Sequence, residues 1–263
     1  MNCIFCKAVS DNSKSVEHII PESLGNKDYV LPKGIVCDKC NNYFSNKIER
    51  PLLDLPYFVS VRHRNMIESK KGRIPIERGV IIADDGYKVN FHIDKNGRSL
   101  SFEDEQAYRY LIEHKRFTVI VLANESPPKN NPHISRFLAK VAVEALAKIG
   151  LTVEGGIQHI VENTGLDPIR NYARFGTGTK FWEYHLRPIY QEAHSFIDES
   201  SGEPYEVLHE FHLFQTQPNL WHLALAIFGF EYCIDLTAPD TDSYIQWLQE
   251  NDNISPLNCP KGS

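Results

Sequence analysis

The chain has 263 residues, of which 42% are hydrophobic and 11% aromatic, and its formal net charge is −6. This composition fits a globular protein with a sizeable core, built as one large domain or as a small module joined to a larger one. The sequence does not open like a signal peptide, and its longest apolar stretch, residues 220–234, is too short and too polar to span a bilayer. We therefore expect a cytoplasmic protein that is not membrane-bound.

The charge is distributed unevenly along the chain. From Glu192 to Asp252 there are twelve acidic residues and no lysine or arginine. Much of the basic excess of the preceding part lies in a strip formed by Arg62, Arg64, Lys70, Lys71 and Arg73. Such a strip can bind phosphates although the whole protein is acidic, and its other interpretation is a solvated hairpin edge.

Four of the six cysteines lie in the first 40 residues as two C-x2-C pairs, Cys3 with Cys6 and Cys37 with Cys40. Two such pairs can complete the tetrahedral shell of a zinc ion, and a reducing cytosol disfavours disulfides. Four thiolates leave no open coordination position, so the zinc is expected to be structural. The other interpretation is coincidental thiols. Cys233 is expected to be a buried core thiol.

The segment between and after these pairs reads as strand, loop, strand, helix. An apolar run over residues 16–20 is typical of a short strand, and a loop with Gly25-Asn26 follows it. A second strand is expected over 34–37. Asp38 is a suitable N-cap for a helix that continues through residues 41–49.

Two motifs carry a family resemblance. The stretches EHIIPESLGN (17–26) and CDKCNNYFSNKIE (37–49) resemble the HNH endonuclease family, in its zinc-stapled branch of the ββα-metal nucleases. The similarity covers about residues 1–54. It implies an HNH module there, followed by a larger α+β domain over 55–263 with a role in target recognition, sensing or dimerisation.

The resemblance implies a role for each matching residue. Glu17 and Asn41 would hold one catalytic divalent ion, for which Mg²⁺ or Mn²⁺ suits such hard oxygen ligands. His18 would be the general base that takes a proton from the attacking water. Asn46, on the same helix, is a weaker candidate ligand.

Two features of this chain test the resemblance. Neighbouring residues of a regular strand point to opposite faces, so a bulge or a strand end must re-aim Glu17 or His18. The family's middle asparagine is also missing from residues 31–36, where a backbone carbonyl could orient the imidazole instead. The acid before the histidine is glutamate, although aspartate is more frequent in the family.

The remainder of the chain alternates between expected strands and helices. Strands are expected over 56–64, 74–102, 117–122, 172–176, 208–215 and 220–236. Within 74–102, turns are expected at 84–86 and 95–97. The strand over 117–122 is expected to be buried. Helices are expected over 103–114, 135–149, 157–163 and 244–250. The fold class is therefore α+β. No P-loop and no dinucleotide fingerprint is present.

Other candidate residues in this remainder allow two interpretations. Arg170, Arg174 and Lys180 could contact phosphate or belong to a surface loop, and Trp182 could stack on a base or pack in the core. His209 and His212 would lie on opposite faces of one strand, which disfavours a second metal site.

The resemblance implies an endonuclease that hydrolyses phosphodiester bonds, with double-stranded DNA as substrate. It also suggests a homodimer for double-strand cutting and a place in restriction or phage defence. The alternative is a zinc-stapled DNA-binding or protein-docking module without catalysis. The missing asparagine and the acidic C-terminal part favour this alternative.

Overall fold

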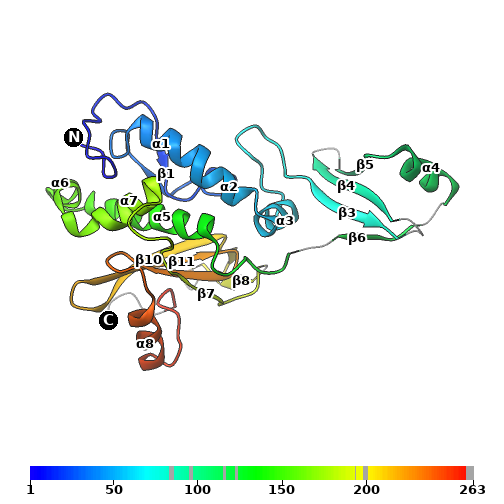
Figure 1. The fold of residues 1–263 in the computed structure, drawn as a ribbon. Coiled ribbons are helices and arrows are strands. Elements are labelled where there is room, and N and C mark those ends of the chain that lie inside the picture. Colours follow the sequence, from blue (N-terminus) through cyan, green and yellow to red (C-terminus); the bar gives the residue numbers. More distant parts are fainter. Residues whose placement is uncertain are drawn as a thin grey trace. The chain divides into compact units, whose positions relative to one another are not determined.

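The computed structural model describes residues 1–82, 86–94, 97–114, 117–121, 124–192, 194–197 and 201–258 (Figure 1). It is an α+β protein, as predicted, and all paired strands are antiparallel. The chain forms two compact units. Unit 1 contains Met1–Pro21, Asn26–Leu52 and Lys129–Ser263, and unit 2 contains Glu22–Gly25 and Leu53–Pro128. This grouping differs from a division at residue 54, because the N-terminal segment packs with the C-terminal half.

The N-terminal segment has the expected order of strand, loop, strand and helix. Strand β1 (Glu17–His18) pairs with β2 (Val30–Leu31), and the turn η1 (Glu22–Leu24) lies between them in sequence. Helix α1 (Asp38–Phe44) continues through the π-helical segment η2 (Ser45–Glu49) into α2 (Arg50–Leu53). The second strand predicted at 34–37 is wrong: Pro32 has no N–H to extend the pairing, and Gly34 turns the chain with a φ of 92°.

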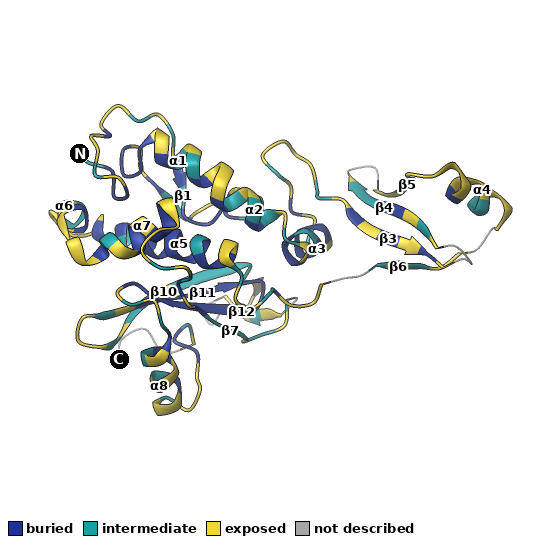
Figure 2. Ribbon diagram, in the orientation of Figure 1, coloured by how far each residue is buried: buried dark blue, intermediate teal, exposed yellow. Residues whose placement is uncertain are grey.

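Helix α5 (Pro132–Gly150) is the central element of unit 1, and most of its residues are buried (Figure 2). Asn131 caps it by accepting hydrogen bonds from the backbone N–H groups of His133 and Ile134. The helices α6 (Gly156–Glu162) and α7 (Asp167–Phe175) follow, with the short turn η3 (Thr164–Leu166) between them. The strand predicted over 172–176 is wrong, because α7 extends to Phe175 and Gly176 ends it in the left-handed region.

The main sheet of unit 1 has the strand order β10-β11-β12-β7. Its strands are β7 (His185–Pro188), β10 (His209–Gln217), β11 (Leu220–Ile227) and β12 (Phe230–Asp235), and β8 (Ser195–Ile197) pairs separately with β9 (Pro204–Glu206). Helices α5 and α8 (Asp242–Glu250) lie on opposite sides of this sheet (Figure 1). Cys233 is a buried core thiol, as predicted, and packs with Tyr244 and Leu248 of α8.

The single long strand predicted over 220–236 is two strands. Phe228 and Gly229 form the turn between β11 and β12, and both have positive φ. A Cβ at Gly229 would collide with the backbone oxygen of Tyr190, so a side chain is excluded there. Both faces of this sheet are covered, so β11 and β12 lack a regular alternation of polar and apolar residues. In the sequence the two strands therefore form one apolar run, which predicts a single strand.

Unit 2 is built on a four-stranded sheet with the order β5-β4-β3-β6. Its elements are α3 (Pro56–Arg64), β3 (Glu77–Ile81), β4 (Tyr87–Asp94), β5 (Gly97–Phe102), α4 (Glu105–Glu113) and β6 (Val119–Val121). The strands expected within 74–102 are confirmed, and the two turns between them fall largely outside the described residues. The strand predicted over 56–64 is wrong: Pro56 opens helix α3, which buries Tyr57, Phe58 and Val61.

Strand β6 lies at the edge of the unit 2 sheet, and Ile120 is 49% exposed there, so the strand is not buried as predicted. In the part of the chain that the structure describes, no helix has the length and apolarity needed to cross a membrane.

Candidate functional site

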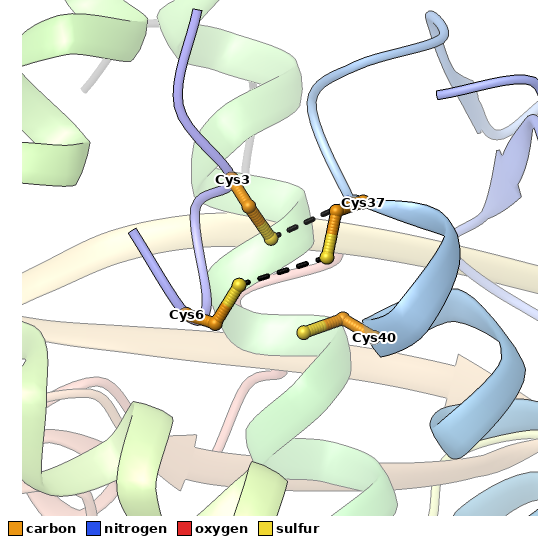
Figure 3. A group of neighbouring side chains, drawn as sticks. All are labelled: Cys3, Cys6, Cys37 and Cys40. Carbon is orange, nitrogen blue, oxygen red and sulfur yellow. Dashed lines mark hydrogen bonds between the residues drawn. The ribbon is translucent and has the colours of Figure 1, made fainter. Parts of the chain in front are cut away.

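The four N-terminal cysteines converge on one point (Figure 3). Their sulfur atoms all lie within 4.8 Å of one another, and the Sγ atoms of Cys6 and Cys37 are 3.6 Å apart. A tetrahedron with zinc–sulfur bonds of about 2.3 Å has edges of about 3.8 Å, so this spacing fits a metal centre. None of the four forms a disulfide. Among the described residues, no other group of three His, Cys, Asp or Glu side chains is close enough to hold a metal.

The local environment affects the thiols differently: it lowers the pKa of Cys3, and burial raises the pKa of Cys6. The hydrogen bond with Cys40 lowers the pKa of Cys3 to about 5, so this sulfur is ionised at neutral pH. The backbone N–H of Cys37 also donates to Cys3 Sγ over 3.3 Å. Sharing a proton with Cys3 raises the pKa of Cys40, and a bound metal would displace that proton, since thiolates are the ligating form.

Asp38 fixes the chain just before β1. It is the first residue of α1 rather than its N-cap, which is Cys37. Its carboxylate accepts hydrogen bonds from the backbone N–H groups of Lys14 (3.0 Å) and Ser15 (2.9 Å). The Ser15 hydroxyl also donates to it, and this bond lowers the pKa of Asp38. The start of the helix is therefore tied to the segment that leads into Glu17 and His18.

Glu17 and His18 differ in burial, as expected for neighbours on a strand. Glu17 is 4% exposed, and its Oε1 lies 2.7 Å from Nζ of Lys140 on α5. His18 is half-buried, and its backbone oxygen accepts a hydrogen bond of 2.9 Å from the same Nζ. One lysine therefore holds the side chain of one residue and the main chain of the next.

Lys140 is the centre of a buried charge cluster. Its Nζ also lies 2.8 Å from Glu49 Oε1 and 3.1 Å from Glu144 Oε2. Burial alone would lower the pKa of Lys140, but the carboxylates of Glu144, Glu17 and Glu49 outweigh it and raise this pKa well above its usual value. Burial also raises the pKa of Glu144 well above its usual range. No local sequence pattern predicts this cluster, because its members come from three distant segments.

Asn41 lies on α1 beside β1. Its Nδ2 donates a hydrogen bond of 3.0 Å to the backbone oxygen of Val16, the residue before Glu17. This bond fixes the orientation of the amide, so Oδ1 is the atom that can accept from, or ligate, another group. The structure therefore brings the side chain of Asn41 next to the strand that carries Glu17 and His18.

Asn26 has a structural role in the module that the sequence did not predict. It is fully buried in the loop before β2, where its Nδ2 donates to the backbone oxygens of Ile20 (2.6 Å) and Tyr29 (3.0 Å). Its Oδ1 accepts from the backbone N–H groups of Asp28 and Tyr29. The loop before the second strand is where the family's middle asparagine was sought. Because β2 begins at Val30, earlier than the second strand predicted at 34–37, the loop that precedes it lies before residues 31–36.

The other candidates of the N-terminal half have mixed environments. Asn46 is exposed, and its Nδ2 donates to the backbone oxygen and Oδ1 of Asn42 on the same helix. Arg62 is only 7% exposed, and burial lowers its pKa. The other four residues of the basic strip are exposed on unit 2: Arg64, Lys70, Lys71 and Arg73.

The candidates on and after α7 serve packing. Arg170 is buried and bonds to Asp167 and the backbone oxygen of Asn163. The guanidinium of Arg174 lies 3.7 Å from the ring centroid of Tyr43, and Trp182 is 2% exposed. The phosphate-binding loop considered for this stretch is therefore not formed by the two arginines, and Trp182 packs in the core.

The C-terminal histidines do not form a second metal centre with other described residues. Buried His222 has Ser243 Oγ at 3.0 Å and Asp235 Oδ2 at 3.3 Å, but both contacts involve Nε2. A Ser-His-Asp triad needs the serine and the aspartate on different ring nitrogens, so this group is structural.

Comparison with known proteins agrees with the geometry of the N-terminal segment. Residues 3–54 match the family model described as HNH endonuclease. No curated protein and no solved structure matches the chain. The matched residues contain the four-cysteine cluster, both strands of the β1-β2 pair and the helix that follows. Residues 3–54 are therefore a module of the HNH endonuclease family, and their cysteine cluster fits its zinc-stapled type.

Proposed function

We propose that this protein is a metal-dependent endonuclease that hydrolyses phosphodiester bonds in double-stranded DNA. The observation that supports it best is the matched HNH module, in which His18 lies on β1 and Asn41 is hydrogen-bonded to the residue before Glu17. His18 acts as general base and takes a proton from the attacking water. Imidazole is the side chain that most often serves as a general base in enzymes.

The residues around His18 fit a hard divalent ion. Glu17 supplies a carboxylate and Asn41 an amide oxygen, with Asn46 as a weaker candidate, and oxygen donors of this kind suit Mg²⁺ or Mn²⁺. Three carboxylates share the single ammonium group of Lys140, so the neighbourhood of Glu17 has more acidic than basic groups. The ion would stabilise negative charge on the phosphate and on the leaving 3′ oxygen.

The four cysteines hold a structural zinc in this proposal. Three of them are buried, and four thiolates leave no position for substrate. The zinc joins the N-terminal loop to the start of α1, which carries Asn41. Its contribution to catalysis is therefore the stability of the module.

Unit 2 is proposed to contribute to target binding. Its exposed basic strip provides four cationic side chains for the phosphate backbone, although burial removes Arg62 from that role. Homodimerisation would supply a second active site for cutting both strands. A cytoplasmic role in restriction or phage defence rests on the family resemblance alone.

The test is plasmid cleavage by the full chain with Mg²⁺ or Mn²⁺. We expect nicking or linearisation that His18→Ala abolishes, while zinc content and the unfolding midpoint stay unchanged. Equal cutting by both proteins would overturn the assignment of His18. Binding of plasmid without any cleavage would favour the alternative of a zinc-stapled DNA-binding module.

A further inference from the structure

One face of α5 is polar although the helix is buried. Arg136, Lys140, Glu144 and Lys148 follow one another at intervals of four residues, which places them along one side of the helix. The three basic members all bond to the HNH module. Arg136 Nη2 donates to the Tyr43 hydroxyl (2.8 Å), and Lys148 Nζ donates to the backbone oxygen of Val30 (3.3 Å).

Lys140 makes the most extensive of these contacts. Its side chain is fully buried, and its Nζ lies within 3.4 Å of five oxygen atoms. Two of them are the backbone oxygens of His18 and Ile19, and three are carboxylate oxygens, of Glu17, Glu49 and Glu144. An ammonium group in such a position fixes both the main chain and a side chain of the same strand.

A contribution to folding stability does not by itself explain why a lysine is buried among these five oxygen atoms. Removing a lysine from water is costly, and apolar residues of similar volume often replace buried ion pairs without loss of stability. The β1 strand has only two residues and pairs on one side with a β2 of equal length. So short a ladder has few hydrogen bonds to hold His18 in place, whereas Lys140 reaches it from another part of the chain.

We propose that Lys140 is a positioning residue of the HNH active site. It holds the Glu17 carboxylate through Oε1 and the His18 main chain through its carbonyl oxygen, so one ammonium group fixes both residues of the two-residue strand β1. The inference rests on the proposed nuclease function and deepens it, because it makes α5 part of the catalytic apparatus.

The variant to test is Lys140→Met in the full chain, which keeps most of the side-chain volume but removes the ammonium group. Its matched control is Lys148→Met, two turns further along the same face, which loses only the contact with Val30. Because Lys140→Met leaves three carboxylates facing one another, Lys140→Met/Glu144→Gln is prepared as a second variant. Zinc content and circular dichroism identify the variants that are folded.

Two measurements separate positioning from folding. The first is kcat and KM for plasmid nicking, and the second is Mn²⁺ affinity measured by electron paramagnetic resonance without nucleic acid. We expect folded Lys140 variants to lose about tenfold or more in kcat, since small displacements at an active site have effects of this size or larger. In the charge-balanced variant Lys140→Met/Glu144→Gln we also expect Mn²⁺ affinity to fall about tenfold, with both quantities near wild type in Lys148→Met.

A folded, zinc-loaded Lys140→Met protein with wild-type kcat and Mn²⁺ affinity would overturn the inference and leave the nuclease assignment intact. Equal losses in Lys148→Met would also overturn it, because the effect would then belong to the whole helix face. If the wild-type protein binds Mn²⁺ but never cleaves, the nuclease function is wrong. In that case, weaker Mn²⁺ binding by Lys140→Met would still support the inference that Lys140 positions the metal-binding residues. A wild-type protein that neither cleaves nor binds Mn²⁺ would overturn both.

A double-variant cycle identifies the route of the effect. If Lys140 acts on the metal site through Glu17, the pair Lys140→Met/Glu17→Gln should lose no more Mn²⁺ affinity than Glu17→Gln alone. Additive losses would show that Lys140 does not act through Glu17 and would overturn that part of the inference.

Discussion

Asn26 ties together the loop that separates the two strands of the HNH module. Its amide uses both ends: Nδ2 donates to Ile20 and Tyr29, and Oδ1 accepts from Asp28 and Tyr29. Only the carboxamide of Asn and Gln offers two N–H donors and a carbonyl acceptor in one small uncharged group, and Asn is the shorter of the two. These bonds connect Ile20, which follows β1, with Tyr29, the residue before β2, and so help to set the spacing of the two strands.

At the residue scale we predict that Asn26→Ala lowers the free energy of unfolding by about 2–4 kcal/mol, because several buried backbone groups lose their partner. Asn42→Ala is the control: this exposed helical residue should change stability by less than about 0.5 kcal/mol. Urea unfolding followed by circular dichroism measures both. Similar midpoints for the two variants would contradict the role assigned to Asn26.

The sequence predicts some of the site residues and leaves others out for a physical reason. The cysteine pairs and the Glu17-His18 motif are local patterns, so spacing and resemblance are sufficient to find them. Lys140 is 122 residues from His18, and nothing near it in sequence distinguishes it from a solvated helix lysine. Only the packing of α5 against β1 shows that it is buried.

At the element scale, the errors concern short segments with mixed patterns. A strand is predicted over the whole of α3 and over residues 172–176 at the end of α7, because aromatic and branched residues dominate these short windows. In each helix a proline occupies the first turn, which is a start signal for helices and is disfavoured in central strands. The longer helices α5 and α8 have clear helical periodicity and were predicted correctly.

The zinc staple is the element-scale feature with the clearest test. We predict that Cys37→Ser releases the zinc, unfolds the N-terminal segment and abolishes nuclease activity, because a structural zinc supplies much of the folding energy of a small module. Cys233→Ser is the control, since this buried thiol lies in the sheet, away from the cluster. Metal analysis should find about one zinc per chain in the wild type and in Cys233→Ser. Full zinc content in folded Cys37→Ser would contradict the prediction.

At the scale of the whole molecule, unit 1 is a layered structure in which α5 serves two neighbours. One side of this helix contacts the HNH module through the polar stripe, and the helix also packs on strands β10, β11 and β12. On the far face of that sheet, α8 covers His222, which approaches Ser243 of α8 and Asp235 of β12. The stability of this sheet should therefore influence the nuclease module.

This connection leads to a prediction about pH. Burial lowers the pKa of His222 below its ordinary 6.5, although Asp235 acts in the opposite direction. A depressed pKa in the folded state means that the unfolded state binds the proton more tightly. The stability from this residue is present above about pH 6.5 and is lost as the pH falls through the lower folded value.

We therefore expect protonation of His222 to lower the unfolding free energy of the wild type as the pH falls below 6.5. The decrease should be at most about 1.4 kcal/mol per pH unit. His222→Gln should lack the part of the pH dependence that comes from His222. Protonation of the zinc thiolates affects both proteins equally, so the difference between their unfolding free energies reports His222 alone. Urea unfolding at pH 7.5, 6.5 and 5.5 measures the difference. Parallel pH curves for the two proteins would exclude His222 as the titrating group.

The chain leaves unit 1 at Leu52 and re-enters it at Lys129, and this order has a consequence for biosynthesis. A ribosome makes the nuclease motif first, then all of unit 2, and only afterwards the helix that supplies Lys140. At typical translation rates the interval is on the order of 10 seconds, during which the nascent motif lacks the lysine that orders it. If the proposed function and the positioning role of Lys140 hold, the nuclease motif is completed only after most of the polypeptide has been synthesised.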